Sequence, residues 1–197
     1  HGEEVFEAAF KAGVDLGFEA SVGGGIPIIR SLTEGLAANR MLSITGIMNG
    51  TSNYILTRMT NEHRDFDEIL LEAKQEGYAE ADPSLDVDGV DAAHKLAIMV
   101  NLAYGTPVPM RAIFTEGISR ISTVDIEFAR ELGFTIKLLG IAKLHENAIE
   151  ARVHPALVPA GSPIAQVNGV YNAIHLIGDA VGDVVLYGKG AGSLPTA

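Results

Sequence analysis

The first half of the chain is dominated by apolar residues at helical spacing, interrupted by short glycine-rich segments. Residues 3–12 have this spacing and predict a helix that Gly13 ends. Residues 17–29 predict a short extended piece followed by three glycines and a proline, where backbone conformation matters more than side chains. Ser31 and Glu34 have the spacing of a capping box, so a further helix is predicted to start at Ser31.

The next segment changes from a strand pattern to a helical one. Residues 42–50 alternate β-branched and small side chains, which predicts a strand running into a turn at its Asn-Gly end. Residues 51–60 are predicted to be helical. Asp65 and Glu68 form a second capping-box pattern, which predicts an amphipathic helix that Gly77 ends.

The second half of the chain has a strand pattern. Residues 134–144 and 148–158 read as one hairpin, and residues 169–178 and 183–192 as another strand pair. Helices concentrated in the first half and strands in the second, without regular βαβ alternation, favour an α+β fold with a layer of helices on a mostly antiparallel sheet.

Composition narrows the possible functions. The 197 residues are 47% hydrophobic and 20% charged, which is enough to bury the core of one globular domain, with a fragment of another. Lys and Arg total 14 against 25 for Asp and Glu, and the resulting net charge of −11 argues against a nucleic-acid partner. No apolar run approaches the roughly 20 residues that span a bilayer, so no membrane partner is expected.

The absence of cysteine excludes disulfides, thiolate metal sites and cysteine nucleophiles. With no signal peptide visible, the expected location is the cytoplasm. The chain begins at His1 inside a helical pattern and ends shortly after a glycine-rich strand end, so we expect a fragment of a longer protein.

Residues 78–89 form an acidic loop that suggests a calcium site. The register argues against an EF-hand, because counting Ser84 as the first ligand puts Lys95 at the twelfth position, where a glutamate is needed. The alternative is an acidic helix N-terminus, favoured by the helix dipole, with Asp86 in the loop and Asp88 as the predicted cap.

Residues 88–99 predict the opening of a helix that then becomes apolar, and Asp91 and Lys95, four residues apart, share one face of it. Such pairs are usually surface ion pairs. This one lies where the helix becomes apolar and just after a loop that carries Tyr78 and Glu80, a position suited to a lysine that exchanges a proton with a substrate oxygen. The spacing alone leaves both interpretations open.

Four stretches, in order along the chain, resemble the successive signatures of homoserine dehydrogenases: FEASVGGGIPII, NGTSNYIL, GYAEADPSLDVDGVDAAHKLAIM and YGKGAGSLPTA. They extend from about Phe18 to Ala197. The third is specific, because its acids, glycines and lysine must all fall in register. The GKGAG piece alone would indicate no more than a turn.

The resemblance implies an NAD- or NADP-dependent oxidoreductase that interconverts L-homoserine and L-aspartate 4-semialdehyde on the route to threonine, methionine and isoleucine. It implies that Lys95 passes the proton, that Asp91 orients Lys95, and that Glu80 binds the substrate ammonium. The other residues it places around the substrate are Asp86, Thr51, Gly50, Tyr78 and Gly77.

The resemblance also implies a monovalent cation, sodium being typical, beside the first glycine loop. Its ligands would be the Glu19 carboxylate and main-chain oxygens, a set that suits a hard cation. The main-chain oxygens would come from Val22, Gly24 and Ile26.

A further implication concerns the nicotinamide cofactor. No strand–GxGxxG–helix unit occurs in the sequence, so the main nucleotide-binding domain is expected to lie outside it. Residues 1–20 would be the end of that domain and residues 21–197 the catalytic and substrate-binding domain, inactive alone. The glycines approaching the nicotinamide would be Gly188, Gly190 and Gly192.

For the fold, the resemblance implies an α+β two-layer sandwich, with an open, mixed, mostly antiparallel sheet, helices on one face, and a homodimer formed through this domain. Two other readings of the sequence stay open. One is a related two-domain semialdehyde dehydrogenase, limited to those without a thiol nucleophile. The other is a non-catalytic module that binds an amino acid and dimerises.

Overall fold

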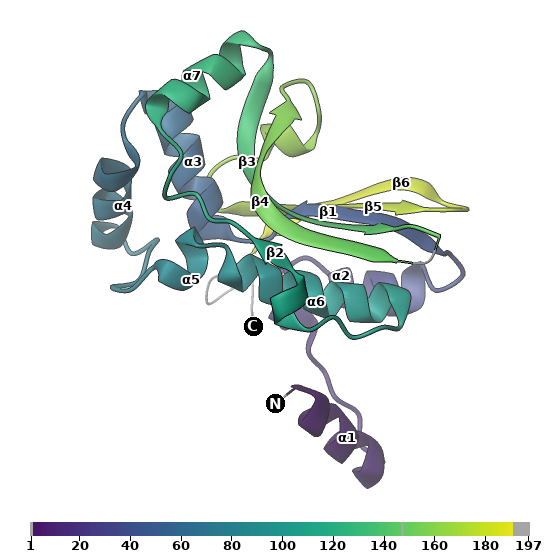
Figure 1. Ribbon diagram of the computed structural model, residues 1–197. Helices are drawn as coiled ribbons and strands as arrows, with labels where there is room; N and C mark the ends of the chain where they lie inside the picture. The colour runs from purple at the N-terminus through teal and green to yellow at the C-terminus, as the bar shows by residue number, and fades with distance from the viewer. Residues whose placement is uncertain (1, 147, 191–197) are drawn as a thin grey trace.

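The computed structural model describes residues 2–146 and 148–190, and it is built on one open sheet of six strands in the order β2-β4-β3-β1-β5-β6 (Figure 1). Only β2 and β4 pair in parallel; every other neighbouring pair is antiparallel. The predicted mixed, mostly antiparallel sheet is therefore confirmed. The strands are β1 (Met41–Ile47), β2 (Phe114–Thr115), β3 (Phe134–Leu144), β4 (Ile149–Pro159), β5 (Tyr171–Gly178) and β6 (Gly182–Lys189).

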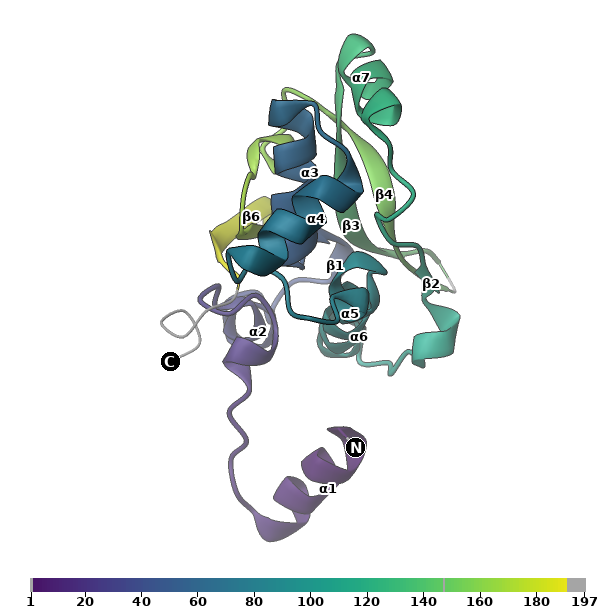
Figure 2. The same ribbon diagram turned by 90° about the vertical axis from the view of Figure 1, so that its left-hand side faces the viewer.

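Helices cover one face of this sheet. α3 (Gly50–Glu62) and α6 (Val90–Tyr104) lie against it, as does α7 (Thr123–Glu131) next to β3, and Figure 2 shows α4 lying on the outer side of α3. The remaining helices are α1 (Gly2–Ala12), α2 (Ile28–Arg30), α4 (Phe66–Gln75) and α5 (Ser84–Val87). Shorter turns are η1 (Glu19–Ser21), η2 (Ser31–Gly35), η3 (Met110–Ala112) and η4 (Ile164–Gln166).

The main core lies between the sheet and these helices, where Ile44 of β1, Ile55 of α3 and Leu96 of α6 are fully buried. A smaller apolar cluster lies on the opposite face, where η4 packs over Ile47 and Leu139. Apolar side chains therefore alternate between the two faces of the central strands, as the strand period of two requires. In residues 2–146 and 148–190, no helix is long and apolar enough to cross a membrane.

Helix α1 stands apart from the rest of the molecule, at the end of an extended linker (Figures 1 and 2). It matches the predicted helix, and Gly13 follows it with a φ of +63°, as a C-terminal glycine should. Its apolar side chains are poorly covered, with Phe10 88% exposed. Phe6 contacts the ring of Phe18 in the linker, edge to face at 5.1 Å.

The predicted start of a helix at Ser31 is wrong. Helical structure already begins at Ile28, and the Ser31 hydroxyl donates to the main-chain oxygen of Pro27 instead of capping a new helix. The first amides are satisfied from outside the helix, because the two carboxylate oxygens of Glu19 accept from the N–H groups of Ile29 and Arg30 at 2.7 and 2.9 Å. The predicted extended segment around Glu19 is in fact the turn η1.

Two other predicted caps are also wrong. Asp65 precedes α4 but its side chain makes no capping hydrogen bond; it accepts from Thr123 at 3.3 Å instead, while Glu68 pairs with Arg64. Asp88 does not cap α6, because the residue at that position is Gly89, with a φ of +81°. The acidic loop therefore leads into α6, which begins through the backbone conformation of Gly89 without a side-chain cap.

Candidate active site

Asn49 lies where β1 ends and α3 begins. Its side-chain oxygen accepts from the Ser52 amide at 2.8 Å, so the predicted Asn-Gly turn is a helix N-cap. Its side-chain nitrogen donates to Asp86 at 2.6 Å and to Asp91 at 2.8 Å. Asn49 is 5% exposed, so one buried amide connects β1, α5 and α6 and orients two carboxylates.

Lys95 is held by two oxygens. Its Nζ donates to Asp91 Oδ2 at 2.6 Å and to the main-chain oxygen of Met48 at 3.0 Å. The Lys95 side chain is 18% exposed, and that of Asp91 31%. Since Asp91 Oδ2 also accepts from Asn49, the carboxylate fixes the ammonium group where it remains open to a ligand.

These groups share a cleft of about 520 Å³. It brings together every residue to which the resemblance assigns a substrate or proton-transfer role, together with Gly190. It carries three carboxylates and one lysine, a balance that favours a ligand with a positive group. The lining residues are Asn49, Gly50, Thr51, Gly77, Tyr78, Glu80, Asp86, Asp91, Lys95, Val170 and Gly190.

One wall of the cleft is the segment of residues 77–80, which follows α4. The Thr51 hydroxyl donates to the main-chain oxygen of Tyr78 at 2.9 Å, and the Tyr78 ring lies 4.5 Å from that of Tyr54. Glu80 is exposed and makes no hydrogen bond or ion pair to other described residues. Its carboxylate is therefore open to a ligand.

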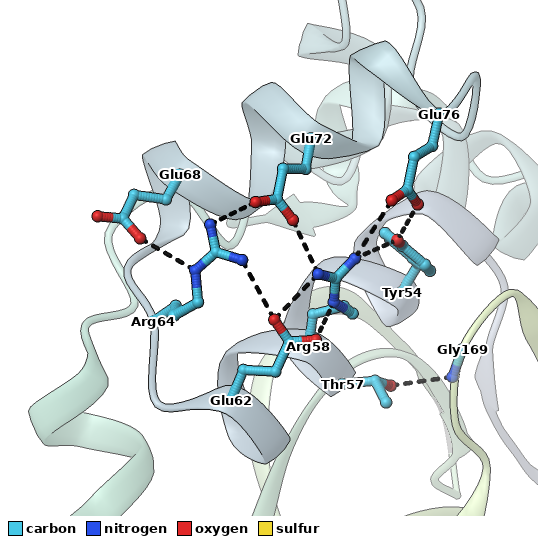
Figure 3. Close-up of polar contacts among 9 residues, drawn as sticks. All are labelled: Tyr54, Thr57, Arg58, Glu62, Arg64, Glu68, Glu72, Glu76 and Gly169. Carbon is cyan, nitrogen blue, oxygen red and sulfur yellow. Dashed lines mark hydrogen bonds and ion pairs between the residues drawn. The ribbon is translucent and has the colours of Figure 1, made fainter.

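Another wall of the cleft is formed at Val170, within the segment of residues 167–171. The Asn53 side-chain nitrogen lies within 3.1 Å of three main-chain oxygens of this segment, and the Thr57 hydroxyl accepts from the Gly169 amide at 3.0 Å (Figure 3). A Cβ on Gly50 would lie 2.9 Å from the main-chain oxygen of Val170. Only glycine therefore fits at Gly50, so this wall can lie close to the start of α3.

The glycines assigned to the cofactor divide into two groups. Gly188 lies near the end of β6 and Gly190 directly follows the strand; a Cβ on Gly190 would lie 2.1 Å from the side-chain nitrogen of Asn172. Gly190 is thus required by packing, and it also lines the cleft beside Lys95. Gly192 lies outside the described residues.

The four residues predicted to bind a cation lie in one turn that packs against the end of β6. The Gly25 amide donates to the main-chain oxygen of Lys189 at 3.1 Å, and a Cβ on Gly24 would lie 2.6 Å from that of Gly190. The Glu19 carboxylate is the one charged group of the set and also caps α2. Oxygen donors with a single negative charge fit a hard monovalent cation. The remaining predicted ligands are Val22, Gly24 and Ile26.

Two lining residues, Asn49 and Val170, were not predicted from the sequence. An asparagine before a helical pattern is a recognisable N-cap signal, although it says nothing about the two carboxylates it orients. Val170 carries no sequence signal, because its place depends on the packing of a loop against α3.

Comparison with known proteins identifies relatives of one kind. Residues 27–197 match the homoserine dehydrogenase family model. A homoserine dehydrogenase of Pseudomonas aeruginosa is 50% identical over 197 residues, which cover all of this chain and 45% of that protein. The crystal structure of a homoserine dehydrogenase from Thiobacillus denitrificans has a TM-score of 0.96 and 53% identity, over 99% of this chain and 45% of that one.

A more distant structure is a hyperthermophilic archaeal homoserine dehydrogenase in complex with NADPH. It matches with a TM-score of 0.83 and 29% identity, over 98% of this chain and 55% of that one. The chain thus spans about half the length of the relatives that it matches.

Proposed function

Because the chain belongs to the homoserine dehydrogenase family, we propose that it is the catalytic part of an NAD(P)-dependent enzyme that interconverts L-homoserine and L-aspartate 4-semialdehyde. The enzyme would act in the biosynthesis of threonine, methionine and isoleucine. The observation that carries the proposal is the convergence of Lys95, Asp91 and Glu80 in one cleft.

Both substrates carry an ammonium group, a carboxylate and a reacting oxygen. Glu80, open at the cleft wall, and Asp86, oriented by Asn49, are suited to bind the ammonium group. Lys95 is suited to contact the reacting oxygen, because its Nζ is held on one side by Asp91 and Met48. Thr51, Gly50, Tyr78 and Gly77 would shape the space between these groups.

The reaction requires a hydride and a proton to move. When bound, the nicotinamide supplies or accepts the hydride at the carbon that carries the reacting oxygen. In the reducing direction, the Lys95 ammonium donates a proton to the aldehyde oxygen as it becomes a hydroxyl; in the oxidising direction, the Lys95 amine takes that proton back. Asp91 holds Lys95 in position throughout.

We propose that the main nucleotide-binding domain lies outside these 197 residues and that residues 1–20 are its end. The separation of α1, with Phe10 exposed, supports this boundary, as does the family match starting at residue 27. Gly188 and Gly190 would approach the nicotinamide, together with Gly192. The NADPH bound by the archaeal relative supports NAD or NADP as cofactor.

A monovalent cation, sodium for example, is proposed to bind Glu19 and the main-chain oxygens of Val22, Gly24 and Ile26. The support is the donor chemistry: one carboxylate and neutral oxygens in a single turn. Because this turn contacts Lys189 and Gly190, the cation would fix the β6 end at the edge of the cleft.

A homodimer formed through this domain is also proposed. The sheet face opposite the helices is covered only in part by η4. On that face, Val185 and Tyr187 are 42% and 58% exposed, and the Tyr187 ring stacks on Tyr171 at 5.0 Å. An apolar, partly covered face suits a second copy of the chain.

The test is to incubate the full-length protein with L-homoserine and NAD or NADP, and to measure oxidation of homoserine through the reduction of the cofactor. The control substrate is L-2-aminobutyrate, which keeps the ammonium and carboxylate but lacks the hydroxyl. We expect the cofactor to be reduced when homoserine is the substrate and not when L-2-aminobutyrate is. A folded full-length protein that binds homoserine by calorimetry and reduces neither cofactor would instead be an amino-acid-binding module.

A further inference from the structure

Two arginines of the α3 region contact the same carboxylates. Arg58 and Arg64 both pair with Glu62, and they share Glu72 of α4, with Nη2 to carboxylate distances of 2.8 and 2.6 Å (Figure 3). Their side chains are 23% and 32% exposed. In charge, exposure and these partners, the two residues are closely matched.

The two arginines differ in what else they reach. Arg64 pairs with Glu68, in the first turn of α4 and at the opposite end of that helix from Glu76 (Figure 3). Arg58 donates through Nη1 to the Tyr54 hydroxyl at 2.6 Å and lies 3.9 Å from Glu76, just beyond the end of α4. Only Arg58 therefore contacts the end of α4 that leads into the cleft wall.

Tyr54 continues this connection to the cleft. Tyr54 is 9% exposed; its hydroxyl donates to Glu76 at 2.6 Å, and its ring lies 4.5 Å from the Tyr78 ring at an interplanar angle of 30°. Burial raises the pKa of the Tyr54 hydroxyl, and the hydrogen bond to Glu76 raises it further, so the hydroxyl remains a donor.

Besides Tyr54, the wall is attached by main-chain hydrogen bonds, by Thr51 and by Ala79, which is 8% exposed and belongs to the main core. After Glu76 the chain turns at Gly77, with a φ of +79°, and the amides of Tyr78 and Ala79 both donate to the main-chain oxygen of Ala73, at 2.8 and 3.0 Å. Thr51 provides one more hydrogen bond. The Tyr54 ring and its anchored hydroxyl are thus a large part of what fixes Tyr78.

We propose that Tyr54, Arg58 and Glu76 are positioning residues that hold the Tyr78–Glu80 wall in register with the cleft, and so set the affinity for the substrate's ammonium group. The identity of the substrate rests on the function proposed above; the coupling of Arg58 to the wall does not. A 1 Å displacement of a binding group is enough to cost a large factor in catalysis.

The experiment compares Arg58→Met with Arg64→Met in the full-length protein. Both variants lose ion pairs to Glu62 and Glu72, so both are expected to lower the melting temperature by similar amounts. Arg58→Met should also raise KM for homoserine roughly tenfold, with a smaller change in kcat and no change in KM for the nucleotide. Arg64→Met should leave all three constants near wild type, and Arg58→Lys should recover part of the loss.

A second measurement does not depend on activity. Amide hydrogen exchange at Tyr78 and Ala79 should be faster in Arg58→Met than in wild type and unchanged in Arg64→Met. Equal exchange and equal kinetics in the two variants would overturn the proposal and leave a purely structural ion network. If the full-length protein does not oxidise homoserine, the function proposed above fails, while the exchange rates still decide whether Arg58 positions the wall.

Discussion

Two lysines of this protein are both largely covered by the fold, yet their surroundings differ completely. Lys95 is 18% exposed, lies beside a carboxylate at 2.6 Å and lines the cleft. Lys137, on β3, is 1% exposed. Its Nζ donates to neutral oxygens only among the described residues: the main-chain oxygen of Val167 at 2.5 Å, Asn53 at 3.1 Å and Asn168 at 3.2 Å.

The difference separates the lysine that we propose to exchange a proton from a lysine that holds segments of the fold together. Burial without a counter-charge lowers the pKa of Lys137 to about 8, because the charged form is poorly solvated there. Lys137 is hydrogen-bonded to Asn53 and to residues 167–168, and so it stabilises the segment that carries Val170 at the cleft. A shifted pKa by itself therefore does not identify a catalytic lysine; the role proposed for Lys95 rests on its access to the cleft and its positioned carboxylate.

The contrast between the two lysines can be tested by substitution, and the largest effect on kcat is expected from Lys95→Ala. Loss of the proton donor should lower kcat by about 10² to 10⁴. The free energy of unfolding should change by less than about 1 kcal/mol, since the lost ion pair is partly exposed. Steady-state kinetics and urea unfolding measure the two quantities. A near-normal kcat would remove Lys95 from its proposed role.

Lys137→Ala should give the opposite pattern. It removes a buried stem and three hydrogen bonds, so a loss of about 2 to 4 kcal/mol in unfolding free energy is expected. In protein that remains folded, kcat should change far less than in Lys95→Ala. Lys137→Met, which keeps the stem, should lose less stability. A kcat loss matching that of Lys95→Ala would contradict the division between the two lysines.

The pH dependence of stability isolates the buried charge of Lys137. The pKa of Lys137 is about 8 in the folded protein, against the ordinary lysine value of 10.5, so the unfolded chain binds more protons between these values. The free energy of unfolding should therefore rise with pH across this window, by on the order of 3 kcal/mol at most. The difference in unfolding free energy between wild type and Lys137→Met, which lacks this group, should be constant below pH 8 and change only above it. A flat difference curve would contradict the assignment.

A smaller effect is expected from Asn49→Ala. It should cost about 1 kcal/mol of stability through loss of the α3 cap. It should also reduce kcat/KM for homoserine roughly tenfold, because Asp86 and Asp91 lose the amide that orients them. Ser122→Ala, which removes the α7 cap far from the cleft, is the control and should lower stability alone. Equal kinetics in the two variants would show that Asn49 is only a cap.

The sequence alone predicted the parts of the molecule that depend on local spacing. The strand hairpins of the second half and helix α1 are confirmed, because alternation and helical periodicity are properties of neighbouring residues. The Asp91–Lys95 contact at 2.6 Å follows from their i, i+4 spacing for the same reason.

Only the tertiary structure determined which residues from distant segments contact one another. The caps predicted at Ser31 and Asp88 are wrong because Glu19, ten residues before Ile29, supplies the acceptors for α2, and Gly89 begins α6 by its backbone conformation. Asn49 meets a carboxylate 37 residues away and another 42 away, and Lys137 meets Asn53 across 84. Local pattern selects helices and strands, whereas packing them on one sheet determines which polar groups are buried together, and thereby where the cleft forms.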